Sequence, residues 1–161
     1  MAPALPPSPL LVTAFNGVVA ASDRATGATR WTFAVPGKSV PGARPRPTHV
    51  EVHDERVLVL AGGSEGTLKK NTFIEVHALD YLEGHLLWTQ RVEGHPTSRF
   101  TGAQLLVEGG QVIVAWSDTL AAFDAASGRV QWRRVSEHGD GGIYQACLDM
   151  GVPGARSRHL P

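Results

Sequence analysis

Seven histidines and one cysteine are the residues of this sequence best suited to metal binding or nucleophilic catalysis. His49 and His53 share one face of an expected strand but lie about 13 Å apart when extended, too far to share one metal ion. His77 and Cys147 each lie in an apolar run, where a packed histidine and a buried, inert thiol are expected. The sequence therefore predicts no catalytic residues, no metal ligands and no cofactor, and we expect that the chain is not an enzyme.

Two loop-like segments suggest ligand chemistry at first sight. The glycine-rich segment 62–70 carries two lysines, but it lacks the Gly-x-x-x-x-Gly-Lys-Ser/Thr order of a phosphate loop, and a strand is expected after it. The proline-rich segment 36–47 is interpreted as a stiff connector, with a proline-rich peptide ligand as the alternative.

Aspartate, glycine and tryptophan recur at one spacing in three places, with glycine four and tryptophan eight residues after the aspartate. An aspartate at a strand end can accept hydrogen bonds from downstream amides, and glycine can adopt the positive φ of a tight turn. The tryptophan then falls on the next strand, where its large side chain can cover the sheet. We interpret these residues as structural turns: Asp23, Gly27, Trp31; Asp80, Gly84, Trp88; Asp124, Gly128, Trp132.

The positions of the turns divide the chain into repeated units. Residues 11–31 align without a gap on residues 112–132, and a third copy lies between them. Short apolar runs between turn signals predict β-strands and little helix. The second copy is predicted to have strands at 48–53, 56–61, 73–79 and 85–92, and the third at 103–108, 111–116, 118–123 and 129–135. Four-stranded antiparallel units in series are typical of propeller blades.

With its Asp-x-x-x-Gly-x-x-x-Trp turns, the chain resembles the repeat of the pyrroloquinoline-quinone-type β-propellers over residues 10–135. The resemblance implies an all-β fold with three blades, at about 10–35, 48–92 and 103–135. Enzymes of that superfamily use a larger ring, a calcium site with Glu, Asn and Asp ligands, often adjacent cysteines, and a periplasmic address. Many other members lack the cofactor, and this chain has one cysteine.

The first repeat lacks its first strand, because the preceding residues 1–9 are rich in proline, which cannot donate to a β-ladder. A spare apolar segment, 142–149, follows the third repeat, and the tail 150–161 is expected to be disordered. Three blades are too few for a closed ring. We therefore predict a homodimer with six blades, closed by exchange of a strand that contains Ile143, Tyr144, Ala146, Cys147 and Leu148. A fragment of a longer propeller, or an arc closed by another protein, are the alternatives.

The net charge and the lengths of the loops indicate which classes of binding partner to expect. The formal net charge is zero, so no general attraction to nucleic acid or to anionic lipid follows. We expect a cytoplasmic protein without a signal peptide or a transmembrane segment. The longer loops share one face of the predicted propeller, and loops on a rigid scaffold often bind partners. That face is modestly basic, and its candidate partner-binding residues are Lys38, Arg44, Arg46, Lys69, Lys70 and Arg99.

The function expected from the sequence is a non-catalytic β-propeller scaffold that binds a protein partner. One alternative is a quinone-dependent dehydrogenase, in line with the resemblance. The other is a structural subunit of a larger assembly.

Overall fold

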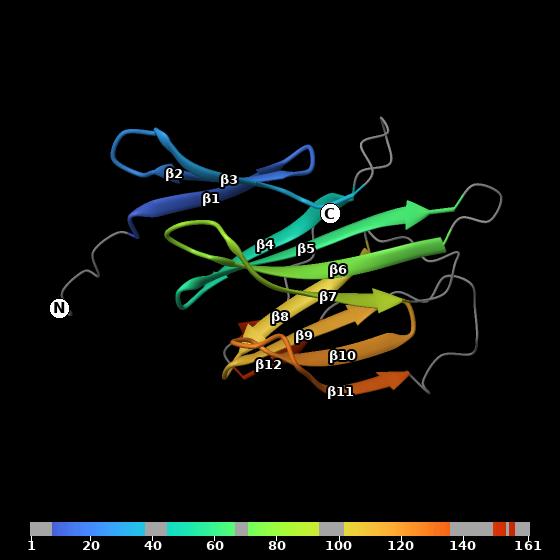
Figure 1. Ribbon diagram of the computed structural model, residues 1–161. Coiled ribbons are helices and arrows are strands. Elements are labelled where there is room, and N and C mark those ends of the chain that lie inside the picture. The colour runs from blue at the N-terminus through green and yellow to red at the C-terminus, as the bar shows by residue number, and fades with distance from the viewer. Residues whose placement is uncertain are drawn as a thin grey trace.

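The computed structural model describes residues 8–37, 45–66, 71–93, 102–135, 150–153 and 155–156. These residues form β-strands joined by turns and loops, and most of the strands belong to three antiparallel sheets (Figure 1). The expectation of an all-β protein is confirmed. Each sheet follows the chain as a meander, which places successive strands side by side.

We call the three sheets blades 1, 2 and 3. Blade 1 contains β1 (Leu10–Phe15), β2 (Val18–Asp23) and β3 (Thr29–Ala34). Blade 2 contains β4 (Arg46–His53), β5 (Arg56–Glu65), β6 (Asn71–Asp80) and β7 (Leu86–Glu93). Blade 3 contains β8 (Gln104–Glu108), β9 (Gln111–Trp116), β10 (Thr119–Asp124) and β11 (Val130–Val135).

Blade 1 has three strands among the described residues, in agreement with the expectation that the first repeat lacks its first strand. In register with the repeat, β1 corresponds to β5 and β9, which are the second strands of their blades. Ser8 and Pro9 precede β1, and Pro9 has no N–H to donate to a ladder. The position of a first strand beside β1 is therefore empty within the described part of the chain.

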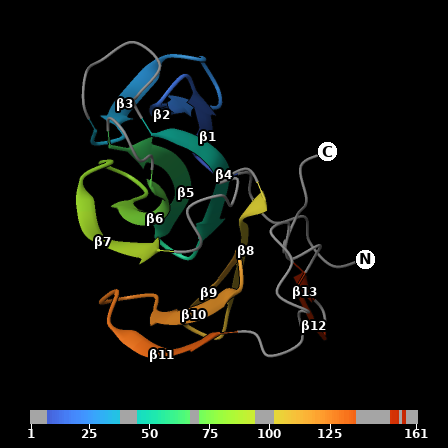
Figure 2. The same ribbon diagram turned by 90° about the vertical axis from the view of Figure 1, so that its right-hand side faces the viewer.

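The blades stack face to face in chain order, and Figure 2 shows β1, β4 and β8 along one side of the stack and β3, β7 and β11 along the other. The side with β1, β4 and β8 corresponds to the inner side of a propeller. Alternate side chains on each strand point to opposite faces of the blade, so blade 2, which lies between the other two, can bury both of its faces.

Two apolar clusters hold the stack together. One lies between blades 1 and 2, and the other lies between blades 2 and 3. Val57 and Val59 point from β5 toward blade 1, whereas Leu58 and Leu60 of the same strand point toward blade 3. All four are at most 1% exposed. The continuous apolar run of β5 is thus explained by a strand that is covered on both faces.

Two segments differ from the sequence-based expectation. Much of the stretch between the predicted strands 56–61 and 73–79 belongs to the β5–β6 hairpin, because Gly63, Ser64 and Glu65 pair with Phe73, Thr72 and Asn71. The tail, expected to be disordered, contains the short antiparallel pair β12 (Gly151–Val152) and β13 (Ala155–Arg156). A turn through Pro153 allows these residues to satisfy backbone groups locally. Among the described segments, none is a helix capable of crossing a bilayer.

Candidate functional site

The three Asp-x-x-x-Gly turns have the same backbone geometry. The N–H of each glycine donates to the carbonyl of the aspartate four residues earlier, at 2.8, 2.9 and 2.8 Å for Gly27, Gly84 and Gly128. Their φ angles are 75°, 75° and 72°. Because a Cβ disfavours this left-handed region, glycine is the residue suited to the position.

The carboxylates of Asp23 and Asp124 stabilise their turns by accepting hydrogen bonds. Asp23 Oδ1 accepts hydrogen bonds from the N–H groups of Ala25 and Thr26, both at 2.9 Å. These backbone donors hold the pKa of Asp23 below its ordinary value. Asp124 Oδ1 accepts from the hydroxyl and the N–H of Ser127, both at 2.8 Å, and these bonds lower the pKa of Asp124 in the same way.

Two of the repeated tryptophans lock one blade onto the next. Trp31 Nε1 donates to the carbonyl oxygen of Tyr81 at 2.9 Å, and its ring packs on Gly84. Trp88 Nε1 donates to the carbonyl oxygen of Ala125 at 3.0 Å, and its ring packs on Gly128. In both cases the acceptor is the residue directly after the aspartate of the following turn. We call this contact the tryptophan lock.

A groove lies beside β1, where the described part of the chain supplies no first strand for blade 1. It has a volume of about 330 Å³ and runs between β1 and β4. Its walls are the backbone and side chains of the middle of β1 and the start of β4: Val12, Thr13, Ala14, Pro47, Thr48, His49 and Val50. The groove is therefore formed by the inner strands of two neighbouring blades.

The groove borders backbone groups of β1 that are unused by the ladder. The N–H of Leu10 donates to the Tyr81 hydroxyl at 2.9 Å, and this hydroxyl donates back to the Leu10 carbonyl at 2.8 Å. Because strand groups alternate between the two sides, Val12 and Ala14 also direct their N–H and C=O groups away from β2. Within the described residues, β1 pairs on that side with no strand.

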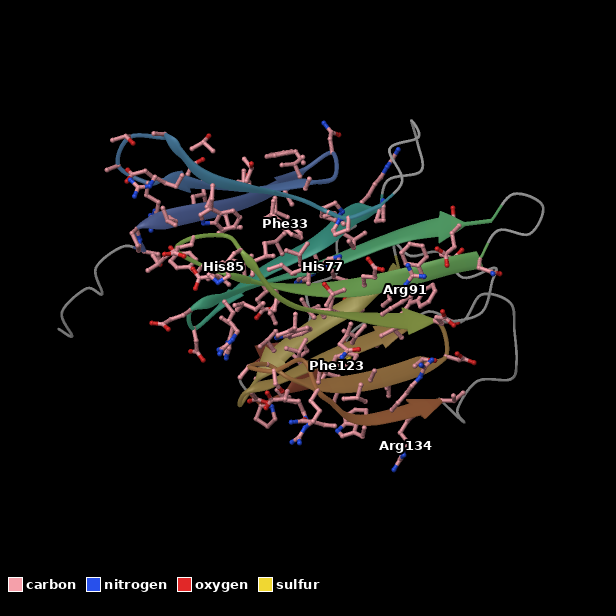
Figure 3. The ribbon with its side chains drawn as sticks, viewed as in Figure 1. Phe33, His77, His85, Arg91, Phe123 and Arg134 are labelled. Atoms are coloured by element: carbon pink, nitrogen blue, oxygen red, sulfur yellow. The ribbon has the colours of Figure 1, made fainter. Side chains whose placement is uncertain are left out.

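A cluster of charged residues lies at the loop end of blade 2, where Arg91 pairs with two carboxylates. Arg91 donates to Glu65 at 2.8 Å and to Glu75 at 2.9 and 3.1 Å, and it lies 3.9 Å above the Phe73 ring. Burial opposes the charge of Arg91, but the two carboxylates raise its pKa. Figure 3 shows Arg91 near the end of β7. Sequence reasoning missed this cluster, because its members come from three strands.

A buried histidine lies beside this cluster. His77 is fully buried, its Nδ1 lies 2.9 Å from Thr89 Oγ1, and its ring centroid lies 5.9 Å from that of Phe33 in blade 1 (Figure 3). Its Nε2 lies 3.4 Å from Glu75 Oε2, and this contact is the main reason why the pKa of Glu75 is lowered. The expectation of a packed, hydrogen-bonded histidine is confirmed.

Several predicted site residues lie outside the described residues. Of the basic loop residues, Arg46 is described and is exposed at the start of β4, whereas the others are not: Lys38, Arg44, Lys69, Lys70 and Arg99. The residues predicted to close the ring are also outside: Ile143, Tyr144, Ala146, Cys147 and Leu148. Both sets remain predictions.

The fold and the tryptophan locks define a β-propeller protein with pyrroloquinoline-quinone-type repeats, as the resemblance implied. The sequence profile of the family described as "Outer membrane protein assembly factor BamB" matches residues 6–149, and the chain belongs to this family. A comparison with curated protein sequences finds no match.

Three of the solved structures that are similar to this chain are dehydrogenases. A europium-containing methanol dehydrogenase has a TM-score of 0.52 at 17% identity, with 83% of this chain and 24% of that chain covered. The quinohemoprotein alcohol dehydrogenase ADHIIG from Pseudomonas putida HK5 has a TM-score of 0.56 at 13% identity, with 79% of this chain and 25% of that chain covered. The quinohemoprotein alcohol dehydrogenase from Comamonas testosteroni has a TM-score of 0.54 at 21% identity, with 79% of this chain and 19% of that chain covered.

These matches contradict the expectation that the chain is not an enzyme, since the three structures reported above are all dehydrogenases. The chain spans about a quarter or less of their length, so the likeness concerns the fold, and it does not establish an activity for this chain. The described residues contain no group of three His, Cys, Asp or Glu side chains able to hold a metal ion.

Proposed function

We propose that this chain is a protein-binding propeller module that accepts an extended polypeptide segment as an added strand along β1. The observation that supports the proposal is that the inner edge of β1, beside the groove, has no partner strand among the described residues, whereas β4 and β8 fill the corresponding position in the other blades. A segment bound there would complete a blade of four strands. The family's description as an assembly factor of outer membrane proteins is in keeping with a protein that handles other polypeptides.

The binding mode follows from the backbone. Val12 and Ala14 offer two N–H donors and two carbonyl acceptors toward the groove, and each ladder hydrogen bond contributes about 1 kcal/mol net. Val12, Ala14 and Val50 add apolar surface for side chains of the bound segment. The site therefore favours an extended ligand with alternating apolar residues over a helical one.

The segment 142–149 of a second copy is the ligand that we propose first, because its sequence, GIYQACLD, is apolar and has no proline. A labelled peptide of this sequence, with serine in place of its cysteine, tests the proposal by fluorescence anisotropy with the full chain. We expect saturable binding. Val12→Pro should weaken it about tenfold or more, because proline removes an edge donor without breaking the β1–β2 ladder.

Val12→Ala is the matched control, since it keeps the backbone donor and shortens the side chain. It should bind the peptide several-fold more tightly than Val12→Pro. Absence of peptide binding, or equal affinities of the two variants, would contradict the proposed site. Alanine replacements at Arg46, Lys69 and Lys70 in the same titration test the basic loop face as an alternative binding surface.

A second candidate function, part of a quinone-dependent dehydrogenase, is favoured by the solved structures that the chain matches. Its test is optical. The purified chain is mixed with pyrroloquinoline quinone and calcium, and the absorbance retained after gel filtration and the reduction of an electron-accepting dye with alcohol are measured. A retained chromophore together with dye reduction would favour this function over strand binding.

A further inference from the structure

The two ends of the blade stack carry the two halves of a tryptophan lock. Within the chain, Trp31 packs on Gly84 and Trp88 packs on Gly128, so each lock joins a blade to the next one. Trp132 stands at the same position of blade 3, but the described residues contain no following turn to receive it. It is partly exposed, whereas Trp31 and Trp88 are 8% and 9% exposed.

The receiving half of a lock lies open at the other end of the stack. Gly27 has the same φ as Gly84, 75°, yet a Cβ built on Gly27 would meet no described atom within 4 Å, while a Cβ on Gly84 would collide with Trp31. The carbonyl of Arg24 corresponds to the acceptor carbonyls of Tyr81 and Ala125. The turn of blade 1 thus has the conformation of a filled lock and carries no tryptophan among the described residues.

The sheet faces around these two positions are also open. Leu11 and Phe15 are 56% and 72% exposed, whereas their counterparts Val112 and Trp116, which pack against blade 2, are 0% and 1% exposed. We call the side of blade 1 that carries Leu11, Thr13 and Phe15 the open face of blade 1. It corresponds to the face that blades 2 and 3 bury against the preceding blade.

The last blade offers a complementary surface. Register places Ile113, Leu120, Trp132 and Arg134 on one side of blade 3, opposite to the side that packs on blade 2. We call this side the open face of blade 3. Figure 3 shows Arg134 pointing away from the rest of the molecule on this side. Each chain therefore has one face that continues the blade-to-blade interface forward and one that continues it backward.

We propose that two copies of this chain close a ring of six blades, in which Trp132 of each copy packs on Gly27 of the other copy and donates its indole N–H to the Arg24 carbonyl. A second copy is the partner that fits, because the open faces continue the interface that the chain forms twice within itself. Rotational symmetry repeats the head-to-tail contact, and six blades fall within the range of roughly four to eight seen in propellers. The inference involves the blade faces and does not depend on the strand-binding groove.

The first measurement is the native mass of the full chain, by light scattering over a range of concentrations. We expect twice the chain mass of 17.2 kDa. Trp132→Ala and Gly27→Ala should each give the monomer mass, because every contact between identical variant copies then lacks one half of the lock. Arg133→Ala is the matched control and should stay dimeric, since Arg133 belongs to the same strand but donates to the Glu93 carbonyl in blade 2.

Mixing the two variants separates loss of the contact from loss of folding. A pair made of one Trp132→Ala copy and one Gly27→Ala copy retains one intact lock, from the native Trp132 of one to the native Gly27 of the other. We expect the mixture to recover dimers at a mass that neither variant reaches alone. A wild-type monomer, a wild-type assembly larger than two copies, dimeric single variants, or a mixture without recovery would each overturn the proposal.

This outcome is separable from that of the strand-binding test. Peptide titration depends on the backbone of Val12, and the mixing experiment depends on Trp132 and Gly27, which lie on a sheet face and in a turn. If dimers form but the peptide does not bind, the six-blade ring is supported and the strand-binding function of the groove is contradicted. If the peptide binds to a chain that stays monomeric, strand binding is supported and the ring is contradicted.

Discussion

Blades 1 and 3 are built from the same repeat, but they bury it differently. Their turns have the same hydrogen bonds and nearly the same glycine φ angle. Phe15 nevertheless stands 72% exposed where Trp116 is 1% exposed. The difference arises because blade 3 has blade 2 against that face, whereas the described residues supply no blade in front of blade 1. Local turn geometry is thus independent of neighbours, whereas burial of a blade face depends on the presence of another blade.

The largest expected contrast between the two blades is in their aromatic residues. Trp116→Ala should lower the free energy of unfolding by about 3–5 kcal/mol, because it opens a cavity between blades 2 and 3. Phe15→Ala should cost less than about 1 kcal/mol when measured by urea unfolding in the Trp132→Ala background, where no second copy covers it. Similar losses for both substitutions would mean that the face of blade 1 is covered within the single chain.

The turn glycines provide a second contrast, at one value of φ. Gly84→Ala should lower the free energy of unfolding by about 2–5 kcal/mol, from the left-handed backbone and from collision with the Trp31 ring. Gly27→Ala should cost about 1–2 kcal/mol in the Trp132→Ala background, because the backbone cost alone remains. Urea unfolding of the two variants against that parent measures both. Equal costs would contradict the open surroundings of Gly27.

The smallest effect is expected for acid pH, where the blades should behave alike. Asp23 and Asp124 both have a lowered pKa in the folded protein, so each adds stability above the ordinary aspartate value of 3.8 that is lost as the pH falls through the lower, folded value. Asp23→Asn and Asp124→Asn should each flatten the acid limb of stability against pH by a similar amount. Unfolding by urea between pH 5 and pH 3 checks this. A flattening confined to Asp124→Asn would show that the turns differ.

Much of the fold was predictable from sequence because its signals are local. The Asp-x-x-x-Gly-x-x-x-Trp spacing indicated three turns, and the apolar runs predicted the strands of blades 2 and 3 within a few residues of their observed ends. The β5–β6 hairpin extends beyond its predicted end, because pairing between strands continued through Gly62 and Gly63. Backbone pairing of this kind leaves no signal in side-chain type.

The candidate sites were less accessible to sequence reasoning. The groove is formed by residues more than thirty positions apart, from β1 and β4, and nothing in either segment alone indicates a cavity. The Arg91 cluster likewise combines residues of β5, β6 and β7. Such sites depend on which strands become neighbours, and that depends on the packing of whole blades.

By itself, the sequence determined the repeat, its turns and which tryptophan follows each turn, because these features depend on φ preferences and hydrogen bonds within about ten residues. Only the tertiary structure decided which glycine each tryptophan covers, since the partner lies in the next blade. It also decided that Gly27 and Trp132 have no such partner among the described residues. The physical reason is that a blade buries its faces only against other blades, so burial is a property of the stack and not of the repeat.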